Sequence, residues 1–262
     1  MTKTAIVTLA IGANYAERFE QLCRRNWTAY AERHGFDVVV LKEPLDFGER
    51  ARRRSPAWQK CLILGLPELK NYERVVWVDS DILINPRAPS IVQGVPMEKI
   101  GATDEHRYPS LETRQNLLRQ VLAVAPEGGD WGKRFWESWL SPGAFHAHFG
   151  LPSGQAHIVQ TGVLVLSPRH HRDLFQHVYD SYDDGGVNLN YEMRPLSHEI
   201  QLRGLPHWID QKFNALIWWL YLERAPIDAA LPEFLRKSYT ENYFLHFAGA
   251  AHLMPMLGPI AG

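Results

Sequence analysis

The chain has 262 residues, 45% of them hydrophobic and 22% charged, which predicts one large folded domain with a substantial core. Its formal net charge of −1 gives no general attraction to nucleic acid or to an anionic membrane. Two cysteines argue against a disulfide framework and fit a reducing compartment. Because no stretch approaches the roughly 20 apolar residues of a membrane span, we expect a cytoplasmic protein, with a peripheral membrane location as the alternative.

The first residues predict a strand, a helix and a second strand. Residues 5–10 form a compact apolar run, an amphipathic helix extends from Tyr15 to about His34, and a second apolar run follows at 36–41. Strands separated by a helix of this length call for a right-handed parallel crossover, hence an α/β sheet that binds its ligands at the carboxyl ends of the strands. This places the residues from Thr8 to Tyr15 in the predicted site.

The stretch from Val75 to Pro86 contains two acidic residues within an apolar sequence. Apolar residues lead to Asp79 and Asp81 and continue after them, which predicts a buried strand that carries both carboxylates to its carboxyl end. Two buried like charges cost several kcal/mol or take up protons, so a cation is expected, and oxygen ligands suit Mg²⁺ or Mn²⁺. The alternative is a turn in which the Asp side chains cap backbone amides.

A basic run precedes the next predicted helix. Residues 49–54 hold four arginines, and Ser55 and Pro56 then start a helix that carries Lys60. The run is interpreted either as a solvated loop or as a mobile loop that closes over a phosphate-bearing donor.

The segment 104–157 departs from the repeating α/β pattern. It contains a predicted helix at 111–124 and then a stretch rich in Pro, Gly and aromatic residues that includes Trp131, Trp136 and Trp139. A simple crossover does not need this length, so we interpret the segment as an insertion that covers the site and contacts an acceptor. Its aromatic residues form either a local core or a platform for stacking on a sugar.

The last third predicts two more strands with polar residues of interest. Residues 158–166 form a strand in which Gly162 lets a ligand approach the backbone. A helix is expected from 168 to about 182 and a short helical run near 195–201. The final strand, 243–249, contains His246, which either is a structural core residue or supplies the third ligand that a site with two carboxylates lacks.

Read together, these motifs resemble the retaining glycosyltransferases of the glycosyltransferase-A fold, especially the glycogenin-like and the galactosyl- and xylosyltransferase families. The resemblance covers most of the chain and depends on motifs in the right order: the uridine-binding turn Thr8-Leu9 with Tyr15, the helix lysine Lys60, Asp79-Ser80-Asp81, Gln160-Thr161-Gly162-Val163 in place of Asn-x-Gly-Val, and His246-Phe247-Ala248-Gly249 in place of His-Phe-x-Gly.

The resemblance implies a single glycosyltransferase-A domain over 1–262, with a mixed, mainly parallel central sheet flanked by helices. Residues 1–103 would form a Rossmann-like half that binds the nucleotide sugar, 104–157 the acceptor-side insertion, and 158–262 the half that binds metal and acceptor. The implied reaction moves a sugar from a nucleotide sugar, a UDP-hexose, to a hydroxyl acceptor such as a saccharide, with retention of configuration and with Mn²⁺ or Mg²⁺ as cofactor. Nucleic acid is not an expected partner.

The resemblance also implies roles for individual residues. Asp79, Asp81 and His246 would bind the metal. The family usually has an Asp-Gln pair, and the segment that contains Glu199 best matches its spacing. Glu199 is therefore the expected catalytic residue, and Glu192 is the alternative. The expected donor-binding residues are Thr8, Leu9, Ala10, Gly12, Tyr15, Lys60, Asp79, Ser80, Asp81, Gln160, Thr161, Gly162, Gly249 and His252.

Three positions depart from the family pattern. Gln160 stands where the family has an asparagine, Gly12 stands where it usually has an asparagine or a threonine, and His252 stands where it has a lysine that contacts the pyrophosphate.

Three other interpretations stay open. A haloacid-dehalogenase-type phosphatase also has Asp-x-Asp after an apolar strand, but nearer to the amino terminus. A sugar nucleotidyltransferase shares the sheet and the Mg²⁺, but it favours an early glycine-rich basic loop. A non-catalytic sugar-binding relative would have no need of both acids.

Overall fold

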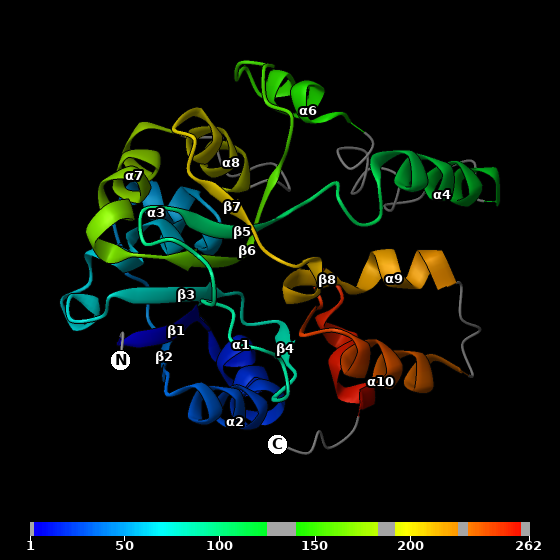
Figure 1. The fold of residues 1–262 in the computed structure, drawn as a ribbon, viewed down its shortest axis with the longest axis horizontal. Coiled ribbons are helices and arrows are strands. Elements are labelled where there is room, and N and C mark those ends of the chain that lie inside the picture. The colour runs from blue at the N-terminus through cyan, green and yellow to red at the C-terminus, as the bar shows by residue number, and fades with distance from the viewer. Residues whose placement is uncertain (1–2, 125–139, 183–191, 225–229, 258–262) are drawn as a thin grey trace.

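A computed structural model describes residues 3–124, 140–182, 192–224 and 230–257. Its centre is a six-stranded sheet, and a three-stranded sheet lies beside it (Figure 1). Among the described residues, no helix is both long enough and apolar enough to span a bilayer.

The six-stranded sheet is mixed and mainly parallel, as predicted. Strand β1 runs parallel to β2 and β3, and β5 runs parallel to β7, whereas β6 is antiparallel to both of its neighbours, β3 and β5. The strands in spatial order are β2 (Asp37–Leu41), β1 (Thr4–Leu9), β3 (Arg74–Val78), β6 (Val159–Leu166), β5 (Ile100–Asp104) and β7 (Pro206–Trp208). The predicted α/β fold is therefore confirmed.

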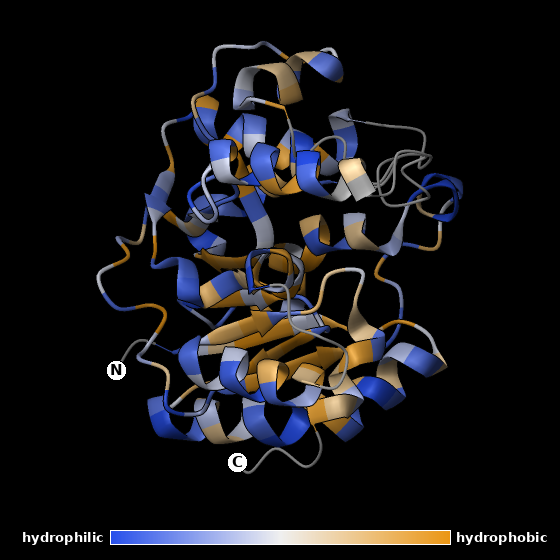
Figure 2. Ribbon diagram, turned by 90° about the vertical axis from the view of Figure 1, so that its right-hand side faces the viewer, coloured by the Kyte–Doolittle hydropathy of each residue, from blue (hydrophilic) through white to orange (hydrophobic). Residues whose placement is uncertain are grey.

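Alternation along the strands gives the sheet a core on each face. Val76 and Val165 are paired neighbours that belong to one hydrophobic cluster, while Val75 and Leu164 belong to the cluster on the other face. Figure 2 shows the apolar strands enclosed by helices whose outer faces are hydrophilic. The α-helices are α1 (Ala13–Arg18), α2 (Arg24–His34), α3 (Glu49–Arg53), α4 (Leu111–Val124), α6 (Pro142–His148), α7 (Pro168–Ser181), α8 (Met193–Leu202), α9 (Ile217–Arg224) and α10 (Leu231–Glu241).

The first helix is continuous over the predicted range, although its middle is wider than an α-helix. Helices α1 and α2 are joined by a π-helical turn at Phe19–Cys23. Gly35 ends α2 with φ 69°, a left-handed conformation in which glycine carries no steric penalty. The second predicted helix start is also observed, as the 3₁₀ helix Pro56–Gly65, whose first turn is capped by the side chain of Ser55.

The basic run before that helix contains a short helix, α3, and one anchored arginine. Arg54 is buried and donates to the carbonyl oxygens of Tyr179 and Tyr182, and its guanidinium lies over the rings of Trp58 and Tyr179. These contacts fix Arg54, the last residue of the basic run, to the carboxyl end of α7. Arg54 is therefore not part of a freely solvated loop.

The strand predicted across both acids is two strands in different sheets, which corrects that expectation. Strand β3 ends at Val78, where the Asp79 amide donates to the carbonyl of Gly162, and a turn closes with the amide of Ile82 on the carbonyl of Asp79. The small sheet then follows, with the order β4 (Ile82–Ile84), β9 (Phe244–His246) and β8 (Ala215–Leu216). Both acids therefore lie in the turn that crosses from one sheet to the other.

Candidate active site

A cavity of about 850 Å³ opens at the carboxyl ends of β1 and β3. Leu9, the last residue of β1, lines it together with Asp79 and Asp81 from the turn after β3 and His246 from the end of β9. Its size falls within the range of small-molecule sites. Its position is the one at which α/β sheets bind ligands, as the sequence predicted.

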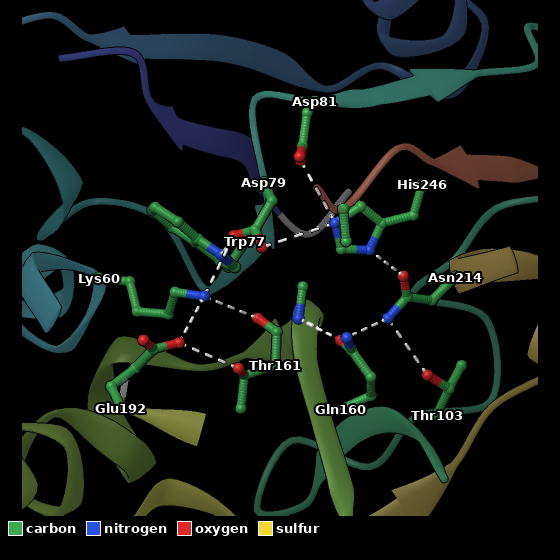
Figure 3. A network of polar contacts seen from close by, with 12 residues as sticks. Lys60, Trp77, Asp79, Asp81, Thr103, Gln160, Thr161, Glu192, Asn214 and His246 are labelled. Carbon is green, nitrogen blue, oxygen red and sulfur yellow. Dashed lines mark hydrogen bonds and ion pairs between the residues drawn. The ribbon is translucent and has the colours of Figure 1, made fainter. Parts of the chain in front are cut away.

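Asp79, Asp81 and His246 converge in this cavity (Figure 3). Their ligand atoms all lie within 4.8 Å of one another, with Nε2 of His246 3.3 Å from Oδ1 of Asp81 and 3.9 Å from Oδ2 of Asp79. Strand pairing produces this geometry, because β4 follows the acids directly and Ile82 is the antiparallel partner of His246. Two carboxylates and one imidazole within this distance fit a divalent cation.

The opposite charges of Asp81 and His246 shift each other's pKa. Burial disfavours ionisation of both groups, but the attraction between them lowers the pKa of Asp81 and raises the pKa of His246. An ion pair between imidazolium and carboxylate is therefore favoured when no cation is bound. A cation that uses Nε2 of His246 has to displace a proton from it.

Lys60 is a buried cation that joins two carboxylates. Its Nζ lies 2.7 Å from Oε1 of Glu192 and 3.1 Å from Oδ1 of Asp79, and it donates to the carbonyl oxygen of Thr161 at 3.1 Å. Burial favours the neutral amine, but the two carboxylates hold the pKa of Lys60 above its ordinary value. All three N–H bonds of the ammonium are thus occupied within the protein.

These contacts also orient Asp79. Its Oδ1 accepts from Nε1 of Trp77 at 2.8 Å as well as from Lys60, whereas its Oδ2 is the oxygen that lies nearest to His246. The ring of Trp77 and the ammonium of Lys60 therefore hold one carboxylate oxygen so that the other faces His246. The sequence did not predict this use of Trp77.

The two glutamates considered for catalysis lie in different places. Glu192 lines the cavity with 2% exposure, and its Oε1 accepts from Lys60 and from the hydroxyl of Thr161 at 3.0 Å. Glu199 is not among the residues that line the cavity. Its carboxylate accepts from Tyr182 and pairs with Arg203 at 2.7 Å, contacts typical of a structural ion pair. Of the two, Glu192, the alternative in the sequence analysis, is the one that lines the cavity.

The remaining expected donor-binding residues divide between the cavity and its surroundings. The cavity is lined by Leu9, Tyr15, Lys60, Ser80, Gln160, Thr161, Gly162, Gly249 and His252. Thr8 and Ala10 are buried beside it, and Gly12 caps α1 with φ 89°, so none of these three lines the cavity. The ring of Tyr15 is exposed at the cavity, as a residue that stacks on a base has to be.

Several residues that line the cavity were not expected from the sequence. Glu105 and His106 line the cavity from the end of β5, and Trp218 and Trp219 line it from α9. The expected stacking residues in 125–139, among them Trp131, Trp136 and Trp139, lie outside the described residues.

Asn214 is also a residue that the sequence analysis missed, and a signal for it exists in the sequence. The resemblance called for an Asp-Gln pair, and the chain has one at Asp210 and Gln211, where the side chain of Asp210 caps the 3₁₀ helix Gln211–Asn214. That helix ends at Asn214, which contacts His246. The pair therefore marks a segment that adjoins the site.

Comparison with known proteins supports the fold. A glycosyltransferase involved in the glycosylation of the major capsid of PBCV-1 matches with a TM-score of 0.56 and 14% identity, over 97% of this chain and 99% of that chain. The galactosyltransferase LgtC, in complex with donor and acceptor sugar analogues, matches with a TM-score of 0.50 and 14% identity, over 92% of this chain and 86% of that one. No protein-family model and no curated protein matches the sequence. The chain thus has a glycosyltransferase-A-like fold.

Proposed function

We propose that the protein is a glycosyltransferase that moves a sugar from a nucleotide sugar to a hydroxyl acceptor, with a divalent cation held by Asp79, Asp81 and His246. The observation that carries the proposal is the convergence of these three groups in a cavity of about 850 Å³ at the carboxyl ends of β1 and β3. The glycosyltransferase-A-like fold supports it, because both proteins compared above share that fold and are glycosyltransferases.

The chemistry explains why such a cluster is useful. A nucleoside diphosphate leaves readily only when its developing negative charge is neutralised, which is what a divalent cation supplies. The protein contributes the orientation of the ligands: Trp77 and Lys60 fix one oxygen of Asp79, and the pairing of β4 with β9 brings His246 to the acids. Mn²⁺ and Mg²⁺ are the cations that we propose.

For the donor we propose a UDP-hexose. The exposed ring of Tyr15 lines the cavity together with Leu9 and Ile11, which suits stacking on a base. The choice of uracil rests on the resemblance of this turn to the uridine-binding turn of the retaining families. Gly249 and His252, which line the cavity beyond the last strand, are proposed to contact the diphosphate.

We further propose that the reaction retains the configuration of the sugar, with Glu192 as the carboxylate that stabilises positive charge on it. The described residues of the cavity include two carboxylates outside the metal triad, Glu105 and Glu192. Both are ion-paired, Glu105 with Arg114 at 2.8 Å and Glu192 with Lys60 at 2.7 Å. Lys60 also contacts Asp79, so Glu192 is the one of the two that this network places beside the proposed metal position. An oxocarbenium-like transition state gains most from an ionised carboxylate at short range.

Release of free UDP from a panel of UDP-hexoses tests the reaction. The wild-type protein with Mn²⁺ should release UDP, excess EDTA should abolish the release, and Asp81→Asn should lower it most among the ligand variants because it removes a charged ligand. Two further assays separate the alternatives: phosphate release from phosphomonoesters indicates a phosphatase, and pyrophosphate release from UTP with a sugar 1-phosphate indicates a nucleotidyltransferase. UDP release at the wild-type rate in EDTA contradicts metal dependence.

A pair of matched variants tests the catalytic carboxylate. Glu192→Gln should lower kcat by about 100-fold or more, since an electrostatic contact made at the reacting centre is lost. Glu199→Gln, the control on the same stretch of chain, should leave kcat within a few-fold of the wild type. The reverse result would return the role to Glu199. Affinity for UDP should stay nearly constant in both variants, because an interaction made only in the transition state does not affect binding in the ground state.

A further inference from the structure

His246 is held from behind by a chain of hydrogen bonds that ends on the backbone (Figure 3). Its Nδ1 lies 2.8 Å from Oδ1 of Asn214, and Nδ2 of Asn214 donates to Oε1 of Gln160 at 2.7 Å. The same Oε1 accepts from the backbone N–H of Gly162 at 2.5 Å. Asn214 and His246 are buried, so these contacts are shielded from water.

The backbone determines the direction of every bond in this chain. The amide of Gly162 can only donate, so the atom of Gln160 that faces it has to be the oxygen. That oxygen accepts a second bond from Asn214, which therefore presents its NH₂ group to Gln160 and its carbonyl oxygen to His246. A carbonyl only accepts, so Nδ1 of His246 carries a hydrogen.

The consequence for the metal position follows from the chemistry of imidazole. A neutral imidazole with a hydrogen on Nδ1 has its lone pair on Nε2. Nε2 is the atom that faces Asp81 at 3.3 Å and Asp79 at 3.9 Å. The hydrogen bonds on one side of the ring thus prepare the other side to bind a cation.

We propose that Asn214 and Gln160 are positioning residues that fix the Nδ1–H tautomer of His246 and so direct its Nε2 lone pair to a divalent cation. The inference rests on the metal site of the proposed function and gives Gln160 a role other than the donor contact that the sequence suggested. Mutation of a residue that hydrogen-bonds a metal ligand typically lowers metal affinity by about 10- to 100-fold.

The elements that carry these residues support the assignment. Asn214 directly precedes β8, and β8 pairs in parallel with β9, with Leu216 opposite His246. The second N–H of the Asn214 amide faces the hydroxyl of Thr103 at 3.4 Å, so its polar atoms are all engaged. The amide group therefore has one orientation that satisfies its neighbours, and the strand pairing fixes its distance from the imidazole.

The test measures Mn²⁺ affinity without a donor substrate, by titration calorimetry or by the spin resonance signal of free Mn²⁺. Asn214→Leu removes the acceptor for Nδ1–H and should weaken Mn²⁺ binding about 10- to 100-fold. Gln160→Leu should weaken binding and Gln160→Glu should preserve it, since only the latter still accepts from Gly162. Thr103→Val removes only the long 3.4 Å contact of Asn214 and keeps both the acceptor for Nδ1–H and the bond to Gln160, so it should leave the affinity unchanged.

Nitrogen NMR of the His246 ring, recorded at alkaline pH where the imidazole is neutral, reports the tautomer directly. We expect the Nδ1–H form in the wild type and a mixture of tautomers in Asn214→Leu. The inference is overturned by an Nε2–H wild type, by wild-type Mn²⁺ affinity in both leucine variants, or by a wild-type protein that binds no divalent cation. If the variants weaken Mn²⁺ binding but no UDP-hexose yields UDP, the positioning role holds and the proposed reaction fails.

Discussion

Replacement of Gly162 by alanine tests how closely the proposed metal ligand His246 depends on the strand behind it. A Cβ at this position would lie 2.5 Å from Cε1 and 2.9 Å from Nδ1 of His246, and 3.0 Å from Oε1 of Gln160. Non-bonded carbon atoms pack at about 3.5–4.0 Å, so the imidazole has to move by about 1 Å or more. The glycine therefore allows the close approach of His246, and it also lines the cavity, where the sequence predicts a ligand close to the backbone.

The displacement should affect both binding and stability. A shift of this size breaks the bond from Nδ1 to Asn214, and we expect Mn²⁺ affinity to fall about 10- to 100-fold, equivalent to about 1.4–2.7 kcal/mol. The added methyl group should also lower the free energy of unfolding by about 1–3 kcal/mol, the usual cost of overpacking. Titration with Mn²⁺ and unfolding in urea measure the two effects separately.

Two other glycines provide matched controls. Gly101→Ala would place its Cβ 2.9 Å from Cβ of Val165 in the core, so it should lower stability without changing Mn²⁺ affinity. Gly65→Ala meets nothing within 4 Å and should alter neither. Wild-type Mn²⁺ affinity in Gly162→Ala would refute the reasoning, and so would an equal loss of affinity in Gly101→Ala.

Three further predictions concern the buried charges and the donor. Lys60→Met leaves Glu192 buried without its cation and should lower the free energy of unfolding by about 3–5 kcal/mol. The double variant Lys60→Met, Glu192→Met should regain much of this stability. A loss below about 1 kcal/mol in Lys60→Met would contradict a stabilising ion pair between Lys60 and Glu192. Burial lowers the pKa of His171 to about 4 from an ordinary 6.5, so the unfolded state binds the proton more readily and stability should fall as pH drops from 6.5 to 4, by at most about 3 kcal/mol. Urea unfolding of His171→Gln should lack this part of the pH dependence, and an unchanged profile would exclude His171 as its source. UDP at a hundredfold excess over its dissociation constant should stabilise the protein by about 2.7 kcal/mol in thermal unfolding, and equal stabilisation by GDP would contradict the assignment of uracil.

The sequence was sufficient to predict the α/β fold and the three side chains that converge in the cavity, Asp79, Asp81 and His246. Apolar runs of strand length separated by a helix lead to a parallel crossover whatever the distant parts of the chain do, and the observed β1, α2 and β2 follow the prediction. Asp79 and Asp81 adjoin a buried strand in the sequence itself. Two acids near a strand end and a histidine in another strand were enough to suggest His246 as their partner.

Tertiary structure decided which residues of each motif face the cavity. Glu192 and Glu199 lie in one short stretch, and the spacing favoured Glu199, but Lys60 contacts Glu192 while Arg203 and Tyr182 contact Glu199. Glu192 directly precedes α8 and Glu199 lies two turns further along it, so the two side chains differ in their position along the helix axis, by about 10 Å, and not in the side of the helix. Which end of α8 reaches the cavity depends on how the helix packs against the sheet, and sequence spacing carries no information on that.

The hydrogen-bond partners of Gln160 also depend on the tertiary structure. Its position in the motif suggested a donor contact, whereas its amide oxygen is taken up by Gly162 and Asn214. A local pattern determines that a polar side chain lies near a strand end. Its hydrogen-bond partner depends on which distant segments the sheets bring together, here β6, the 3₁₀ helix before β8, and β9, and only the folded chain specifies that.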